Sequence, residues 1–235
     1  MAERLRLHLG CGATRLEGWV NCDLFPAPHV DVAFDVQKTW PFGDGTVAHI
    51  YASHLLEHLS DPWAFFSEAW RVLHPVGGMV LRLPHGGHRA AWWDLTHVRP
   101  WFPESFACLQ PGYAEAVGNP QHLGRPIAFG IESVDQRVSG KFARPLRWRP
   151  FRRVFCAFAA NLADACEELW VRLYALKTPE QIAAYQRTRT AQCVPSRYVI
   201  YRHHWERREV QPGETDVLVP LAELEVVNGF HAWHW

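Results

Sequence analysis

The sequence predicts an α/β fold built on a doubly wound, mostly parallel sheet. Three observations favour this fold class. Short apolar runs typical of strands recur along the first part of the chain, turns containing glycine or aspartate follow them, and a segment with helical spacing of apolar residues separates two of them. Ligands bind such a sheet at the carboxyl ends of its strands, so functional residues are expected in the turns that follow the strands.

The strands expected in the first part of the chain are Leu5–Leu9 and residues 19–22, 30–34, 49–52 and 79–83. The last of these runs is almost wholly apolar, as expected for a parallel strand that is covered on both faces. A helix is predicted before it, because Asp61 suits an N-cap and Pro62 suits the first helical position. Residues 75–78, of sequence PVGG, are expected to end that helix.

The second part of the chain is expected to form a cap and to complete the sheet. Residues 127–138 and 196–205 favour strands, and the tail over residues 209–235 favours one or two short strands before the terminal HAWHW. A long helix is predicted over residues 152–177, as a lid or packing element rather than a dimer seam. Its apolar residues step by three or four: Phe151, Phe155, Phe158, Leu162, Cys166, Leu169, Leu173 and Leu176.

We therefore expect a single domain over residues 1–235. Its core covers residues 1–106. A helical and loop cap with the substrate region is expected over residues 107–195, inserted after the fifth strand and between the last strands, with a core strand near Ile131. Residues 196–235 are expected to hold the last core strand, near Tyr198, and a C-terminal extension.

The composition is that of an ordinary globular protein, with 48% hydrophobic and 20% charged residues. The formal net charge is zero, so no field of the whole molecule draws it to nucleic acid or to an anionic membrane. The first residues lack the apolar run of a secretory signal, and no stretch is long enough to span a bilayer, which predicts a cytoplasmic protein. Six scattered cysteines without a CxxC pair argue against a zinc knuckle or a disulfide framework.

A glycine turn and an acidic residue early in the chain predict a nucleotide-like cofactor. Gly10 and Gly12 follow the first strand, where glycine lets the backbone approach a ligand closely. Asp23 ends the second strand, where a carboxylate can accept hydrogen bonds from both hydroxyls of a ribose. The turn has no third glycine, and residues 13–18 are too few for a full helix, which argues against a dinucleotide because a pyrophosphate needs a helix N-terminus.

The order of the motifs resembles a known family. The strings LHLGCG, GWVNCD, VDVAFDV, WPFGDGTVAHIYASHLLEHL, RVLHPVGGMVLRLPH and DLTHVRPWFPESF are similar to those of small class I S-adenosylmethionine (SAM)-dependent methyltransferases, of the type 11 domain. The resemblance covers Leu5 to about Phe106. It implies a Rossmann-like fold, SAM as cofactor and S-adenosylhomocysteine as product.

The resemblance also implies the residues that hold the cofactor. Gly10 and Gly12 would border the methionine moiety, Asp23 would hold the ribose, and Asp35 with Val36 would flank the adenine. Ser53 and His54 would line the mouth where the methyl group faces its acceptor. The complete implied set is Gly10, Cys11, Gly12, Asp23, Leu24, Asp35, Val36, Ser53 and His54.

Histidines support two further hypotheses. His54, Glu57 and His58 match HxxEH, the spacing of one class of zinc peptidase, but a strand directly before the motif and Asp61-Pro62 after it leave little helix to present ligands. We assign no metal ligands. In the loop after the fifth strand, His85 or His97 is a candidate general base, although positioning alone can supply much of the acceleration of a methyl transfer.

The sequence does not select one class of methyl acceptor. The acceptor is an oxygen or nitrogen atom of a sugar, a nucleic acid or a small metabolite, and a non-catalytic module that keeps the fold is the alternative to an enzyme. The chain lacks the NPPY-like tetrapeptide of enzymes that methylate adenine or glutamine. The segment from Lys141 to Arg153 holds six basic residues and no acid, so it is either a site for an anionic partner or a solvated loop.

Overall fold

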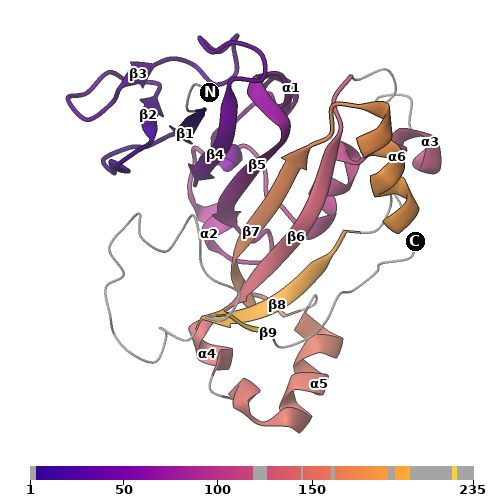
Figure 1. The fold of residues 1–235 in the computed structure, drawn as a ribbon. Helices are drawn as coiled ribbons and strands as arrows, with labels where there is room; N and C mark the ends of the chain where they lie inside the picture. The colour runs from indigo at the N-terminus through magenta and orange to yellow at the C-terminus, as the bar shows by residue number, and fades with distance from the viewer. Residues whose placement is uncertain are drawn as a thin grey trace.

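The computed structural model describes residues 4–118, 126–143, 145–159, 162–189, 194–201 and 224–226. These residues form one nine-stranded sheet in the order β3-β2-β1-β4-β5-β7-β6-β8-β9, which Figure 1 shows as a continuous twisted surface. The sheet is mostly parallel and carries helices between its strands, so the predicted α/β class is confirmed.

The first five strands are parallel neighbours and agree with the sequence prediction. They are β1 (Leu5–Leu9), β2 (Val20–Asp23), β3 (Val32–Ala33), β4 (Val47–Ser53) and β5 (Leu73–Pro84). β1 lies between β2 and β4, and β4 pairs with β5. Because all five run in the same direction, the turns that follow them meet at one edge of the sheet.

Helix α1 (Pro62–Val72) begins where the sequence predicts. The side chain of Asp61 accepts a hydrogen bond from the backbone N–H of Ala64 at 3.0 Å, and Pro62 occupies the first turn. The helix buries Phe65, Phe66, Ala69 and Val72 in the main apolar core. β5 starts directly after the helix, earlier than predicted.

The other helical segments lie in the connections between the strands. They are η1 (Leu56–His58), α2 (Ala90–Trp93), η2 (Pro103–Leu109), α3 (Tyr113–Val117), α4 (Gly140–Ala143), η4 (Pro145–Arg147), α5 (Arg149–Phe158) and α6 (Pro179–Thr188). Figure 1 shows α2 near the carboxyl end of β5, with α4 and α5 beyond the end of the sheet that carries β8 and β9. α5 packs on a second, smaller core that contains Phe155 and Tyr198.

The predicted long helix over residues 152–177 is wrong in its second half. Residues Cys166–Ala175 form strand β7, which pairs antiparallel with both β5 and β6 (Phe129–Val138). Leu169 and Leu173 are four residues apart and therefore satisfy a helical period and a strand period equally. Val171, fully buried between them, fits only the period of two, so the sequence pattern was ambiguous and sheet pairing decided it.

The strands after β7 extend the sheet at its far edge. β8 (Ser196–Tyr201) joins it, as predicted, by pairing in parallel with β6, and β9 (Leu224–Val226) pairs antiparallel with β8. The segment predicted as a cap, residues 107–195, thus supplies two long sheet strands. Apart from β9, the tail over residues 209–235, including the terminal HAWHW, lies outside the described residues.

Candidate functional site

Most of the predicted site residues lie in turns at the carboxyl edge of the parallel strands. β1 ends immediately before Gly10, β2 ends on Asp23, and β4 ends on Ser53. Asp35 and Val36 follow β3. The topology therefore gathers segments that are separate in the sequence at one edge, where ligands bind in sheets of this kind.

Both glycines of the first turn adopt a left-handed backbone. Gly10 has φ +64° and Gly12 has φ +52°, values that side-chain-bearing residues rarely adopt. A Cβ on Gly10 would approach Leu55 Cδ1 to 3.0 Å, whereas a Cβ on Gly12 would have no heavy atom within 4 Å. The turn is thus closed on the side of Gly10 and open beside Gly12.

The carboxylate of Asp23 is fixed against this open turn. Its Oδ2 accepts the backbone N–H of Gly12 at 2.8 Å, and its Oδ1 accepts the backbone N–H of Phe25 at 3.3 Å. Each oxygen keeps a further lone pair, and the residue is only partly buried. The side chain is therefore oriented and still able to accept hydrogen bonds from a ligand.

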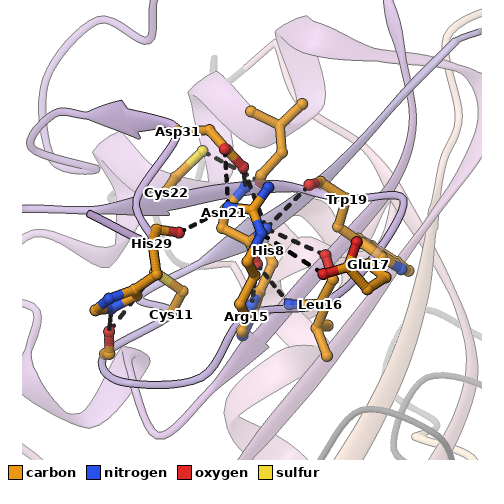
Figure 2. A network of polar contacts seen from close by, with 12 residues as sticks. His8, Cys11, Arg15, Leu16, Glu17, Trp19, Asn21, Cys22, His29 and Asp31 are labelled. Carbon is orange, nitrogen blue, oxygen red and sulfur yellow. Dashed lines mark hydrogen bonds and ion pairs between the residues drawn. The ribbon is translucent and has the colours of Figure 1, made fainter. Parts of the chain in front are cut away.

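The segment after the first strand is held by a buried asparagine, whereas a helix often follows the first strand of such a sheet. Residues 10–19 contain turns and no helix. Fully buried Asn21 bonds both backbone groups of Leu16, donates to the carbonyl oxygen of Trp19, and accepts from Nδ1 of His8 at 3.1 Å. Figure 2 shows these bonds converging on Asn21, which holds the turn in place without a helix.

Asp31 and Arg15 complete this network on its outer side. Asp31 Oδ2 accepts the backbone N–H of Asn21 at 2.8 Å, and Asp31 Oδ1 accepts Arg15 Nη1 at 2.9 Å (Figure 2). These hydrogen bonds, led by the backbone one from Asn21, lower the pKa of Asp31 to about 2. The sequence analysis missed Asn21, Arg15 and Asp31, although polar residues inside a short strand-turn-strand segment are a usable signal.

The other predicted cofactor residues differ in accessibility. Cys11 is buried, and burial raises the pKa of its thiol, so it is not a nucleophile at neutral pH. Leu24 is exposed, Asp35 accepts the backbone N–H of Gln37 at 2.9 Å, and the side chain of Val36 is buried in the main core. A ligand can reach Leu24 and Asp35 directly, but it can contact Val36 only through the backbone.

His54 lies in a strained turn between two carboxylates. Its φ of +52° is unusual for a residue with a side chain, and its backbone N–H bonds the carbonyl oxygen of Arg82 at 2.8 Å. Its Nδ1 lies 3.2 Å from Glu57 Oε1 and its Nε2 lies 3.4 Å from Glu168 Oε1. Hydrogen bonds to Glu168 and Glu57 raise the pKa of His54 to about 9, so it is an imidazolium at neutral pH and not a base.

Glu168 is the centre of a charge cluster that the sequence analysis missed. Burial opposes its ionisation, but the hydrogen bond from His54 and the charge of Arg82 outweigh burial and hold its pKa well below the usual range. Arg82 bonds it at 2.9 and 3.1 Å and Arg137 at 3.0 Å. A single arginine in the apolar run of β5 was the signal for this cluster, but its partners come from β6 and β7.

The two predicted general bases have different surroundings. His85 accepts the backbone N–H of Gly87 with Nδ1 at 2.9 Å, and its Nε2 lies 3.1 Å from Gln136 Oε1. Burial lowers the pKa of His85 to about 4, so it is neutral with both nitrogens engaged. Nδ1 of His97 is buried and has no hydrogen-bond partner among the described residues. Of these two histidines, His97 is the one with a ring nitrogen that lacks a partner within the described part of the chain.

The HxxEH motif does not form the helix that a zinc peptidase of this class requires. η1 is a single 3₁₀ turn that starts after His54, whose ring is bound by Glu57 and Glu168. Among the described residues, the side chains that converge as possible metal ligands are Glu57, His58 and His97. His54 is not one of them.

The basic segment from Lys141 to Arg153 covers α4, η4 and the start of α5. Lys141 Nζ lies 3.6 Å from Asp164 Oδ2. Arg144 and the side chains of Arg147, Arg149 and Arg152 lie outside the described residues. An anionic partner at this segment stays a prediction. In the part of the chain that is described, no helix has both the length and the apolar character to cross a membrane.

Comparison with known proteins points to one family. Residues 7–81 match the family described as a methyltransferase domain. An uncharacterized methyltransferase of Mycobacterium sp. (strain KMS) is 40% identical over 62 residues, which are 24% of this chain and 23% of that protein. The chain therefore matches less than a quarter of the length of this relative.

Solved structures are similar over a larger share of the chain at lower identity. A SAM-dependent methyltransferase of Archaeoglobus fulgidus covers 73% of this chain and 86% of its own, with 14% identity and a TM-score of 0.45. One from Mesorhizobium loti covers 72% and 90%, with 15% identity and a TM-score of 0.39.

Proposed function

We propose that this chain, whose residues 7–81 match the methyltransferase domain family, transfers the methyl group of SAM to an oxygen or nitrogen atom of an acceptor. The observation that carries the proposal is the pair formed by Gly12 and Asp23. The open left-handed glycine and the oriented carboxylate lie side by side, joined by a 2.8 Å hydrogen bond at the carboxyl edge of β1 and β2.

The residues around this pair fit SAM. The space beside Gly12 admits a ligand against the backbone, and both oxygens of Asp23 keep lone pairs for the two ribose hydroxyls. Leu24 and Phe25, both exposed, lie next to Asp23 and provide apolar surface for the adenine, with Asp35 as a polar partner. A dinucleotide fits less well, because residues 10–19 contain no helix N-terminus for a pyrophosphate.

When bound, SAM would supply an electrophilic methyl group on its sulfonium, which the acceptor atom attacks in line, so that the carbon–sulfur bond breaks and S-adenosylhomocysteine leaves. The protein would position the acceptor at Ser53 and His54, at the end of β4. His54 is charged and bound at both ring nitrogens, so it contributes an oriented cation and does not remove a proton. His85 is neutral with both nitrogens engaged, so positioning is the main contribution that these residues can make. His97 remains the candidate base.

The acceptor classes predicted from the sequence remain the candidates: a sugar, a nucleic acid or a small metabolite. Exposed Trp92 and Trp93 in α2, after β5, would suit stacking on a flat face of the acceptor. The basic segment from Lys141 would suit an anionic acceptor. The cytoplasmic location also stays a prediction.

Calorimetric titration with SAM and S-adenosylhomocysteine tests this function. We expect saturable binding to the wild-type protein and no detectable binding to Asp23→Ala with unchanged circular dichroism. Asp44→Ala is the matched control, because Asp44 is exposed and paired with Arg71 away from the site. Absence of heat with the wild-type protein would contradict the proposal. Binding without transfer of label from methyl-labelled SAM to any pool of sugars, nucleic acids or metabolites would favour the non-catalytic module.

A further inference from the structure

Three possible ligands for a metal ion converge beside the turn after β4. Glu57 and His58 belong to η1, and His97 comes from the loop between α2 and η2. One carboxylate oxygen and one nitrogen from each histidine lie within 4.8 Å of one another. The group includes none of the residues proposed to bind SAM.

Two of these side chains carry a buried polar atom that has no hydrogen-bond partner in the described part of the chain. Glu57 is 2% exposed; its Oε1 bonds His54, and its Oε2 is buried with no partner among the described residues. The side chain of His97 is 9% exposed, and its Nδ1 is likewise buried without a partner. Buried polar atoms normally have hydrogen-bond partners. A carboxylate oxygen and a ring nitrogen without partners on neighbouring side chains therefore point to a site for a ligand that binds both.

The third side chain is held in the tautomer that a metal ligand needs. The hydroxyl of Thr96 donates to Asp94 Oδ1 at 2.7 Å, so its oxygen can accept a hydrogen bond from Nδ1–H of His58 at 3.0 Å. The carbonyl oxygen of Thr96 also lies 3.3 Å from this nitrogen. With the proton on Nδ1, Nε2 of His58 carries a free lone pair. Histidines that bind metals are typically oriented by such a bond from the other ring nitrogen.

The two rings are arranged as neighbouring ligands of one ion. Their centroids lie 4.8 Å apart at an interplanar angle of 71°. Two imidazoles on one tetrahedral zinc, with Zn–N bonds of about 2.0–2.1 Å, have ring centres roughly 5 Å apart. The loop is also fastened to η1, because the backbone N–H of Val98 donates to the carbonyl oxygen of Glu57 at 2.7 Å. Donor atoms on one tetrahedral zinc lie about 3.4 Å apart, so the present spacing of up to 4.8 Å must close by about 1.4 Å, and the ring of His58 is exposed and has room to rotate.

We propose that Glu57 Oε2, His58 Nε2 and His97 Nδ1 bind one divalent transition-metal ion. Two imidazole nitrogens and one carboxylate oxygen suit zinc or a similar borderline cation, whereas calcium and magnesium prefer oxygen ligands. Three protein ligands leave a fourth position open for water or another small ligand. With Nδ1 of His97 bound to the ion, His97 would not act as the general base of the methyl transfer. The site differs from the zinc-peptidase reading of HxxEH, because the glutamate is a ligand and His54 is not.

The test is a metal titration of tag-free protein that has been stripped with a chelator. We expect one equivalent of Zn²⁺ to bind by calorimetry, and one equivalent of Co²⁺ to give visible absorption bands typical of a four- or five-coordinate site. His97→Ala and His58→Ala should each abolish stoichiometric binding. Thr96→Val should weaken it by about 10–100-fold, the usual effect of losing the group that orients a ligand.

His49→Ala is the matched control, because His49 lies near the amino end of β4, away from the site. It should bind zinc as the wild-type protein does. Less than one equivalent of zinc on the wild-type protein, or wild-type affinity in either ligand variant, would overturn the proposal. His58→Ala removes an exposed ring, so it keeps the test valid if His97→Ala fails to fold. SAM binding by the same variants is measured separately, so a failure of the metal site is distinguishable from a failure of the methyltransferase proposal.

Discussion

The two sides of the carboxyl edge are held together in different ways. On the side proposed to bind the cofactor (the cofactor side), a neutral asparagine bonds backbone groups close to it in the sequence, at Leu16 and Trp19. On the side proposed to hold the acceptor (the acceptor side), ionised groups from four strands and turns meet at Glu168, whose partner Arg82 is 86 residues away. The first arrangement depends only on residues that are close together in the sequence. The second exists only when β4, β5, β6 and β7 have paired in the correct register.

This difference predicts that the largest loss of stability comes from the acceptor side. Glu168→Ala would leave Arg82, Arg137 and His54 without their shared counter-charge in a largely buried position. Removing one partner of a buried ion pair costs about 3–5 kcal/mol. The free energy of unfolding in urea measures the effect. Glu17→Ala, whose side chain is 93% exposed, should change stability by less than about 0.5 kcal/mol. An equal loss of stability in Glu168→Ala and Glu17→Ala would contradict the proposed importance of the Glu168 cluster.

A smaller loss is expected on the cofactor side. Asn21→Ala would leave backbone groups of Leu16 and the ring of His8 without partners, at a cost of about 1–3 kcal/mol. Because Asn21 also fixes the turn between Gly10 and Asp23, SAM affinity should fall as well, whereas Glu168→Ala should retain it at a temperature where that variant is folded. Urea unfolding and calorimetry measure the two effects. A stable Asn21→Ala variant with unchanged SAM affinity would contradict the role of this network.

The smallest effect is a dependence of stability on pH at His54. Its pKa is raised from 6.5 in the unfolded chain to about 9 in the fold, so its contribution is fully present below pH 6.5 and is lost as the pH rises through 9. The side chain is 45% exposed, so solvent screening limits the contribution to about 1 kcal/mol. Unfolding in urea at pH 6 and pH 9.5 should show this loss in the wild-type protein and not in His54→Gln. The same loss in both proteins would assign it to another group.

Sequence patterns predicted the local part of this edge well. The strand Leu5–Leu9 has the predicted bounds, and helix α1 starts at the predicted cap, Asp61. Both depend on residues within a few positions of one another: alternating apolar side chains in one, and a side chain that bonds a nearby N–H in the other. The placement of Gly10, Gly12 and Asp23 at one edge followed for the same reason, because consecutive parallel strands bring their following turns together.

The errors came where a pattern fits two structures. The step from Leu169 to Leu173 satisfies both a helical and a strand period, and only the pairing of β7 with β5 and with β6 selects the strand. The contact of His97 with Glu57 and His58 was likewise not predicted, because the sequence suggested the latter two only as members of HxxEH; the role of His97 as a base stays a prediction. Contacts between distant segments depend on strand register, which no local spacing records.

The sequence by itself determined the sheet class, the first parallel strands and the glycine turn with Asp23, because each depends on short-range backbone preferences and apolar spacing. Tertiary structure alone decided that residues Cys166–Ala175 form a strand inside the sheet. It also decided that Glu168 gathers the charges of three other elements, and that His97 meets Glu57 and His58. The physical reason is that these contacts join residues far apart in the chain, so their energies arise only once the sheet has assembled.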